Sequence, residues 1–131
     1  LELKYIRNPK KPFIANSSPL GFLEIGYINI DNLFFLFSTE EKKAVIAHEY
    51  WHYKNNFCYE IKKIWLIFCF NQIKKLQEFE ADIYAARKIG VKPTLSMLKR
   101  IKQMIKYGKI SYNYKNHPTM EERIANITRL K

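Results

Sequence analysis

The sequence predicts an α+β fold, a mainly helical compact domain with a small N-terminal β-sheet beside the helix that carries an HExxH motif at residues 48–52. Apolar residues alternate with polar ones in the stretch that leads to Ile30, which indicates a strand. Two capping-box signatures further along the chain mark the starts of helices. Because the chain has 131 residues, of which 47% are hydrophobic, it can form one core, and we expect residues 1–131 to be a single domain.

The N-terminal third is expected to supply the sheet. Residues 8–12 and 16–19 are rich in turn formers, so the chain around them can hold only short extended pieces. Leu20–Ile30 is expected to be the main strand, half-buried or at an edge of the sheet. Residues 33–37 fit either a strand or a helical turn. Residues 1–19 are interpreted as an irregular or regulatory segment.

The helix with the HExxH motif is expected to start after Ser38. Ser38 and Glu41 have the spacing of a capping box, in which each side chain bonds to the backbone N–H of the other. The helix should run to about Asn55.

Three further helices are expected in the C-terminal two-thirds. One, interrupted or not, should span roughly Glu60–Ile89 and end at Gly90, because glycine suits a left-handed C-terminal cap. The next should start at Pro93. Thr119 and Glu122 form a second capping box, which should open a short last helix.

The HExxH motif carries the strongest chemical signal. Residues four apart lie on one face of a helix, so His48 and His52 can bind one metal ion while Glu49 faces what that metal binds. Catalytic zinc usually takes three protein ligands and keeps the fourth position for water. The alternative is two histidines packed on a helix beside a solvated glutamate.

A third ligand has to come from elsewhere in the chain. No further histidine follows at the spacing of an HExxHxxGxxH site, so a glutamate of the second helix is the natural candidate. Glu78 and Asp82 are four apart, so one can bind the metal and the other can hold a ligand imidazole. Such a pair is otherwise a solvated acidic face.

The sequence resembles a known family at this point. HExxH, then Glu78-x-x-x-Asp82, then His117-Pro118 followed by Arg123, is similar to the catalytic domain of gluzincin metallopeptidases of the HtpX and Ste24 type. The closer resemblance is to their small soluble relatives, the minigluzincins, and it runs from about Gly26 to the C-terminus.

The resemblance implies a zinc-dependent endopeptidase with one Zn²⁺ per chain. Because the strand Leu20–Ile30 could bind substrate by adding a β-strand to its edge, we expect extended or unfolded polypeptides as substrates. The resemblance also implies latency through a terminal segment or through a homo-oligomer that masks the active site. The implied roles are zinc ligands His48, His52 and Glu78, general base and acid Glu49, imidazole-orienting Asp82, and site-lining catalytic residues His117 and Arg123. From the residues alone, His117 could equally be a turn histidine before a proline, and Arg123 could form a surface salt bridge.

Charge and composition limit the partners. The net charge is +11, but lysine dominates over arginine, so we expect a polypeptide substrate and no specific nucleic acid. The longest apolar run, Ile64–Phe70, is far shorter than the roughly 20 residues of a membrane span. Without a signal-peptide pattern or a paired-cysteine motif, a cytoplasmic location is expected.

Two alternative functions stay open. One is a target-specific regulatory zinc protease of the antirepressor type, which shares HExxH and a later acidic ligand. The other is a non-catalytic basic module in which the metal is structural. Glu49 argues against the structural module, since a structural metal site has no need of that carboxylate.

Overall fold

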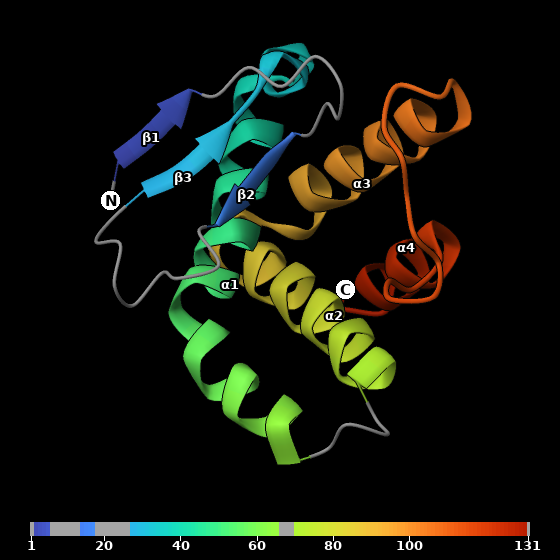
Figure 1. The fold of residues 1–131 in the computed structure, drawn as a ribbon. Helices are drawn as coiled ribbons and strands as arrows, with labels where there is room; N and C mark the ends of the chain where they lie inside the picture. The colour runs from blue at the N-terminus through green and yellow to red at the C-terminus, as the bar shows by residue number, and fades with distance from the viewer. Residues whose placement is uncertain (1, 6–13, 18–26, 66–69, 131) are drawn as a thin grey trace.

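A computed structural model of the chain describes residues 2–5, 14–17, 27–65 and 70–130 (Figure 1). The described part is mainly helical with one small sheet, so the fold class expected from the sequence is confirmed. No helix in these residues is long and apolar enough to cross a membrane. In chain order the elements are β1 (Glu2–Tyr5), β2 (Ala15–Ser17), β3 (Tyr27–Ile30), the 3-10 helix η1 (Asn32–Leu36), α1 (Thr39–Trp65), α2 (Phe70–Ile89), α3 (Val91–Lys106) and α4 (Met120–Thr128).

The sheet has the strand order β1-β3-β2, with β3 parallel to β1 and antiparallel to β2. The expected main strand is confirmed for Tyr27–Ile30, while residues 20–26 lie outside the described part. The expectation of an edge position is wrong, because β3 pairs on both sides. Both outer strands come from the segment 1–19, which was interpreted as irregular or regulatory; its remaining residues, 1, 6–13 and 18–19, lie outside the described part.

Two helix boundaries differ from the expectation. α1 continues to Trp65 instead of ending near Asn55, and α2 begins at Phe70 rather than at Glu60. The chain has no glycine or proline between Gly26 and Gly90 that would break a helix. The Asn55 side chain donates to the Trp51 carbonyl within the helix (2.8 Å), so it supports α1 instead of capping it.

The short connections agree with the local sequence. Residues 32–36 form a 3-10 turn rather than a strand, and the Asp31 carboxylate accepts a hydrogen bond from the backbone N–H of Asn32 (2.6 Å). Gly90 has φ 122° and ψ 153°, which only glycine adopts readily, although it is not the left-handed helical cap that was expected. α3 begins at Val91, and Pro93 fits within its first turn because the N–H groups there have no helical acceptor.

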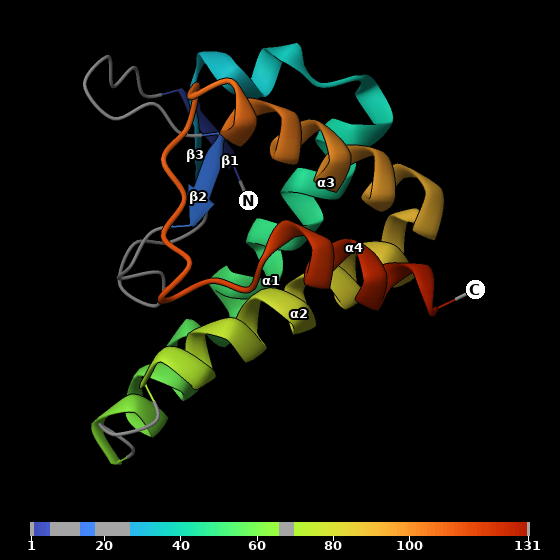
Figure 2. The ribbon, with the colours of Figure 1, turned by 90° about the vertical axis from the view of Figure 1, so that its right-hand side faces the viewer.

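The helices pack so that three of them meet near the centre of the domain. α1 lies along α2 and carries the sheet on its other side, α3 contacts both of them, and α4 packs against α2 and α3 (Figures 1 and 2). The core between these elements includes Phe34, Val45, Leu98, Met104 and Ile127. The middle of α1, the middle of α2 and the start of α4 therefore come together.

Glu41 links the start of α1 to α3. Its buried carboxylate accepts hydrogen bonds from the Ser38 backbone N–H (2.8 Å), the Ser96 hydroxyl (2.6 Å) and Nε of Arg100 (2.8 Å). Burial alone would raise the pKa of Glu41, but the hydrogen bonds from Arg100, Ser96 and Ser38 outweigh it and lower the pKa from 4.5 to about 2. The ionised carboxylate therefore stabilises the fold.

We predict that Glu41→Gln lowers the free energy of unfolding by about 1–2 kcal/mol at pH 7. Because the pKa of Glu41 is lowered in the folded state, its contribution is complete above pH 4.5 and is lost as the pH falls towards about 2. The difference between wild type and variant, measured by urea unfolding, should shrink over that range. Glu40→Gln is the control, since Glu40 pairs with Lys43 in solvent. A pH-independent difference for Glu41→Gln would contradict the assignment.

Candidate metal site

Two helices bring together three side chains that could bind a metal ion. His48 and His52 lie one turn apart on α1, and Glu78 faces them from α2. The two Nε2 atoms are 3.1 Å apart, Oε2 of Glu78 lies 3.6 Å from Nε2 of His48, and Oε1 of Glu78 lies 3.4 Å from Nε2 of His52. His48 is buried, and the other two side chains are mostly so.

These distances fit the needs of a metal ion. In a tetrahedral zinc site with ligands at about 2.0–2.1 Å, neighbouring ligand atoms are about 3.3–3.4 Å apart. The distance of 3.1 Å between the two nitrogens, and those of 3.4 and 3.6 Å from them to the two different oxygens of Glu78, lie close to that value. The group could therefore hold a metal ion, and two imidazoles with one carboxylate suit zinc better than magnesium or calcium, which prefer oxygen ligands.

Asp82 orients one of the two imidazoles. Its Oδ1 lies 2.8 Å from Nδ1 of His48. An ionised carboxylate only accepts hydrogen bonds, so Nδ1 carries a proton, and in the neutral ring Nε2 is the nitrogen that can bind a metal beside Glu78 and His52. Asp82 is fully buried, and the side chain of Glu78 is 13% exposed. The alternative of a solvated acidic face is therefore wrong.

Arg123, near the start of α4, neutralises the carboxylates of α2. Its Nε and Nη2 donate to the two oxygens of Asp82, both at 2.7 Å, and its Nη1 lies 3.2 Å from Oε2 of Glu78. Arg123 is only 4% exposed, so the surface salt bridge considered from the sequence is wrong. Its guanidinium lies behind the ligand carboxylate and helps to hold it.

The electrostatics of this cluster are set by burial and by Arg123. Burial alone would raise the pKa of Glu78 and of Asp82, but the charge of Arg123 outweighs it and holds the pKa of both carboxyls below their usual values. Burial alone would lower the pKa of His48, but the hydrogen bond with Asp82 outweighs it and raises that pKa. Both carboxylates are therefore ionised near neutral pH.

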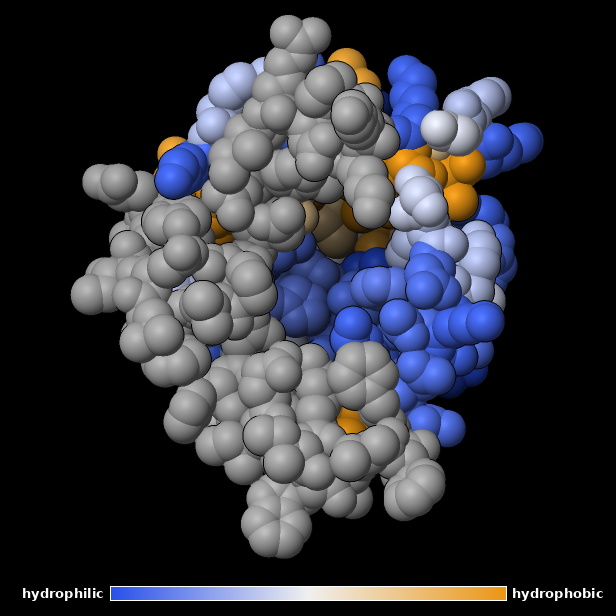
Figure 3. All heavy atoms as spheres, in the orientation of Figure 1, coloured by the Kyte–Doolittle hydropathy of each residue, from blue (hydrophilic) through white to orange (hydrophobic). Residues whose placement is uncertain are grey.

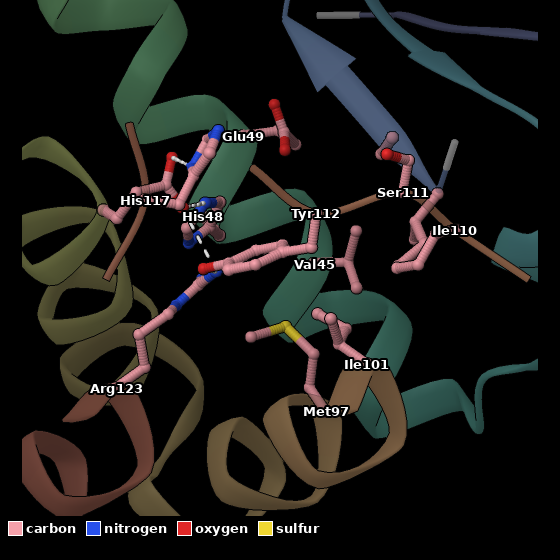
Figure 4. A pocket seen from close by; sticks show the side chains of 13 residues that line it. Val45, His48, Glu49, Met97, Ile101, Ile110, Ser111, Tyr112, His117 and Arg123 are labelled. Atoms are coloured by element: carbon pink, nitrogen blue, oxygen red, sulfur yellow. Dashed lines mark hydrogen bonds and ion pairs between the residues drawn. The ribbon is translucent and has the colours of Figure 1, made fainter. Parts of the chain in front are cut away.

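A pocket of about 310 Å³ opens beside the three ligands. In the orientation of Figure 1, this face of the molecule is hollowed at its centre, where hydrophilic side chains lie beside hydrophobic ones (Figure 3). Glu49, His48, His117 and Arg123 form its polar end (Figure 4). Its apolar wall contains Val45, Met97, Ile101 and Ile110.

His117 lies in the connection between α3 and α4 and reaches the same pocket. Its Nδ1 is 3.5 Å from Oε1 of Glu78, and this buried atom has no hydrogen-bond partner. The imidazole side chain is 35% exposed. His117 does precede a buried proline, as in a turn, and it also faces the metal ligands. The structure thus brings together all the residues singled out from the sequence, namely His48, Glu49, His52, Glu78, Asp82, His117 and Arg123.

Two features of the pocket were not foreseen. Tyr112 lines it beside His117 but belongs to no motif that the sequence reveals. Met97 and Ile101, both on α3, also line the pocket, although apolar residues on a helix are usually expected to fill a core. Periodicity shows that a residue faces inward but cannot tell a filled core from the wall of a pocket.

No protein family matches this sequence, and comparisons with curated proteins and with solved structures gave no match. The family resemblance of the motifs therefore remains an expectation. The geometry of the site is the ground on which a function can be proposed.

We predict that the chain binds one zinc ion and that Glu78→Gln weakens binding by more than roughly 100-fold, since even partners outside the ligand shell contribute 10- to 100-fold. Arg123 keeps Asp82 as a partner in this variant, so the fold should persist. Competition with a chromophoric chelator measures the affinity. Glu80→Gln is the matched control on α2, outside the metal group. Equal affinities for both variants would rule out Glu78 as a ligand.

We also predict that Arg123→Met lowers the free energy of unfolding by about 3–5 kcal/mol, because it leaves the Asp82 carboxylate buried without its cation. Lys102→Met is the control, since Lys102 and Glu121 form an ion pair at 2.6 Å between half-exposed side chains. That change should cost less than about 1 kcal/mol. Urea unfolding measures both variants. A similar loss of unfolding free energy in the two would show that the ion pair between Arg123 and Asp82 does not hold α4 in place.

Proposed function

We propose that this protein is a zinc-dependent endopeptidase that hydrolyses peptide bonds of extended or unfolded polypeptides. The observation that carries the proposal is the convergence of two imidazoles and one carboxylate at zinc-ligand spacing, beside a pocket that Glu49 also lines. Three protein ligands are typical of catalytic zinc, whereas structural zinc takes four. Within the described part of the chain the group has three members.

His48, His52 and Glu78 would hold the zinc ion, which would supply the Lewis acidity that acidifies water and polarises a carbonyl group. The carboxylate of Glu49 accepts the proton of the attacking water and delivers it to the nitrogen of the leaving amine. Glu49 follows His48 directly in α1 and reaches the pocket from the same helix (Figure 4). Its neighbours in the chain therefore fix the base beside the metal ligands.

His117 and Arg123 have different roles in this proposal. The part-exposed imidazole of His117 can donate a hydrogen bond to the negative charge that develops on the scissile carbonyl oxygen. Arg123 is buried and bound to Asp82 and Glu78, so in this proposal it holds the carboxylates at the polar end of the pocket. Support of the ligand carboxylates is thus added to the site-lining role expected of Arg123.

The pocket suits a polypeptide. Its apolar wall can accept an aliphatic or aromatic side chain next to the polar end. Ile14 and Ala15, at β2, also line it. Since β3 is central, an added substrate strand would pair with β2, whose outer edge pairs with no other described strand.

The proposal is tested by digestion of casein with the zinc-loaded chain beside Glu49→Gln. We predict that the variant keeps zinc affinity and loses activity by roughly 100-fold or more, because only the proton carrier is removed. Glu80→Gln controls for the loss of a carboxylate. Equal cleavage by wild type and Glu49→Gln would contradict the mechanism.

A dilution series of the same digestion separates the alternatives. Activity per molecule that rises on dilution would show that a homo-oligomer masks the site. No cleavage at any concentration, with zinc bound, would contradict a general endopeptidase and favour the antirepressor-type protease or the structural module.

A further inference from the structure

The connection between α3 and α4 forms one wall of the pocket although residues 107–119 contain no helix or strand. Such a segment keeps its shape only if its backbone groups find partners outside regular structure. Part of the answer is a turn at Asn113, whose carbonyl accepts hydrogen bonds from the backbone N–H groups of Asn116 (3.1 Å) and His117 (3.0 Å). This turn holds the backbone N–H of His117, but it does not hold the backbone that follows His117.

The hydroxyl of Tyr112 holds the backbone that follows His117. It donates a hydrogen bond to the carbonyl of Pro118 at 2.6 Å, and Pro118 is fully buried. The same oxygen accepts a weaker hydrogen bond from Nη1 of Arg123 at 3.5 Å. One hydroxyl thus joins the residue after His117 to the guanidinium that supports the metal ligands.

The position of the His117 ring depends on this hydrogen bond between Tyr112 and Pro118. Its Nδ1 lies 3.5 Å from Oε1 of Glu78, within ion-pair distance but without the geometry of a hydrogen bond, so this contact alone holds the imidazole only weakly. The Tyr112 ring packs against it, with centroids 5.2 Å apart and planes inclined by 40° (Figure 4). The backbone and Tyr112 therefore contribute to the position of the imidazole beside its contact with Glu78.

We propose that Tyr112 is the positioning residue for His117, holding the imidazole over the pocket through the hydrogen bond to Pro118 and through ring packing. The catalytic consequence rests on the proposed function, whereas the positioning itself does not. Two independent readouts therefore test it.

The first readout is the NMR signal of the His117 ring in the metal-free chain. The chain has only three histidines, so each ring signal can be assigned by substitution. In Tyr112→Phe we expect the His117 signal to shift and broaden. Tyr114→Phe is the control, because it removes a hydroxyl from the same connection. Tyr114 is half-exposed, and the centroid of its ring lies 5.0 Å from that of Tyr112. A His117 signal that is the same in wild type and Tyr112→Phe would overturn the proposal.

The second readout is a double-mutant cycle on peptide cleavage. Tyr112→Phe should lower kcat roughly tenfold with unchanged zinc affinity, the effect of one hydrogen bond. In the His117→Ala background the same change should have little further effect. An equal loss in both backgrounds would show a merely structural tyrosine and overturn the proposal. If the wild type cleaves nothing, the proposed function fails, and the imidazole signal still decides the role of Tyr112.

A second variant covers the case in which Tyr112→Phe does not fold. Site-specific 3,5-difluorotyrosine at position 112 keeps the ring and the hydroxyl but changes the strength of the donor. The His117 signal should then shift while the fold persists. An unchanged signal would count against positioning by the hydroxyl.

Discussion

The structure depends on one buried carboxylate, that of Asp82. A charge in the interior is tolerated only when its oxygens are bonded and an opposite charge lies beside it. The oxygens of Asp82, which lies on α2, accept hydrogen bonds from Nδ1 of His48 on α1 and from the guanidinium of Arg123 on α4. The guanidinium also supplies the opposite charge. Asp82 thus fixes α1, α2 and α4 relative to one another at the candidate metal site.

The same network divides the site into a rigid part and an adjustable part. The metal-binding group lies on α1 and α2, where helix geometry and Asp82 fix the side chains. His117 lies on an irregular connection that is held by a hydrogen bond from the hydroxyl of Tyr112. Sites on regular elements are held more exactly than sites on loops. Metal affinity is accordingly expected to depend on the helices, and the proposed peptidase activity also on the connection.

The sequence predicts the local features of this protein well and the long-range ones less well. The capping boxes at Ser38 and Thr119 are present, because they need only residues three apart. The i, i+4 spacing likewise placed His48 with His52, and Glu78 with Asp82, on common faces. The extent of α1 was missed because no local signal ends it before Trp65.

The sequence could not show which strands and which side chains pair through tertiary contacts. The central position of β3 depends on short outer strands with weak patterns of their own. That Arg123 is buried follows from a partner 41 residues away, and local spacing does not reveal it. Tyr112 was missed for the same reason, since its hydroxyl acts through Pro118 and Arg123.

The most direct test of the central claim is X-ray absorption spectroscopy of the zinc-loaded chain, which reports the atoms bound to the metal. The geometry of His48, His52 and Glu78 predicts nitrogen and oxygen neighbours at about 2.0–2.1 Å, with imidazole scattering from two histidines. A shell of sulfur at about 2.3 Å, which Cys58 and Cys69 would have to supply, would contradict it. So would a zinc ion whose surroundings stay the same after His52→Ala.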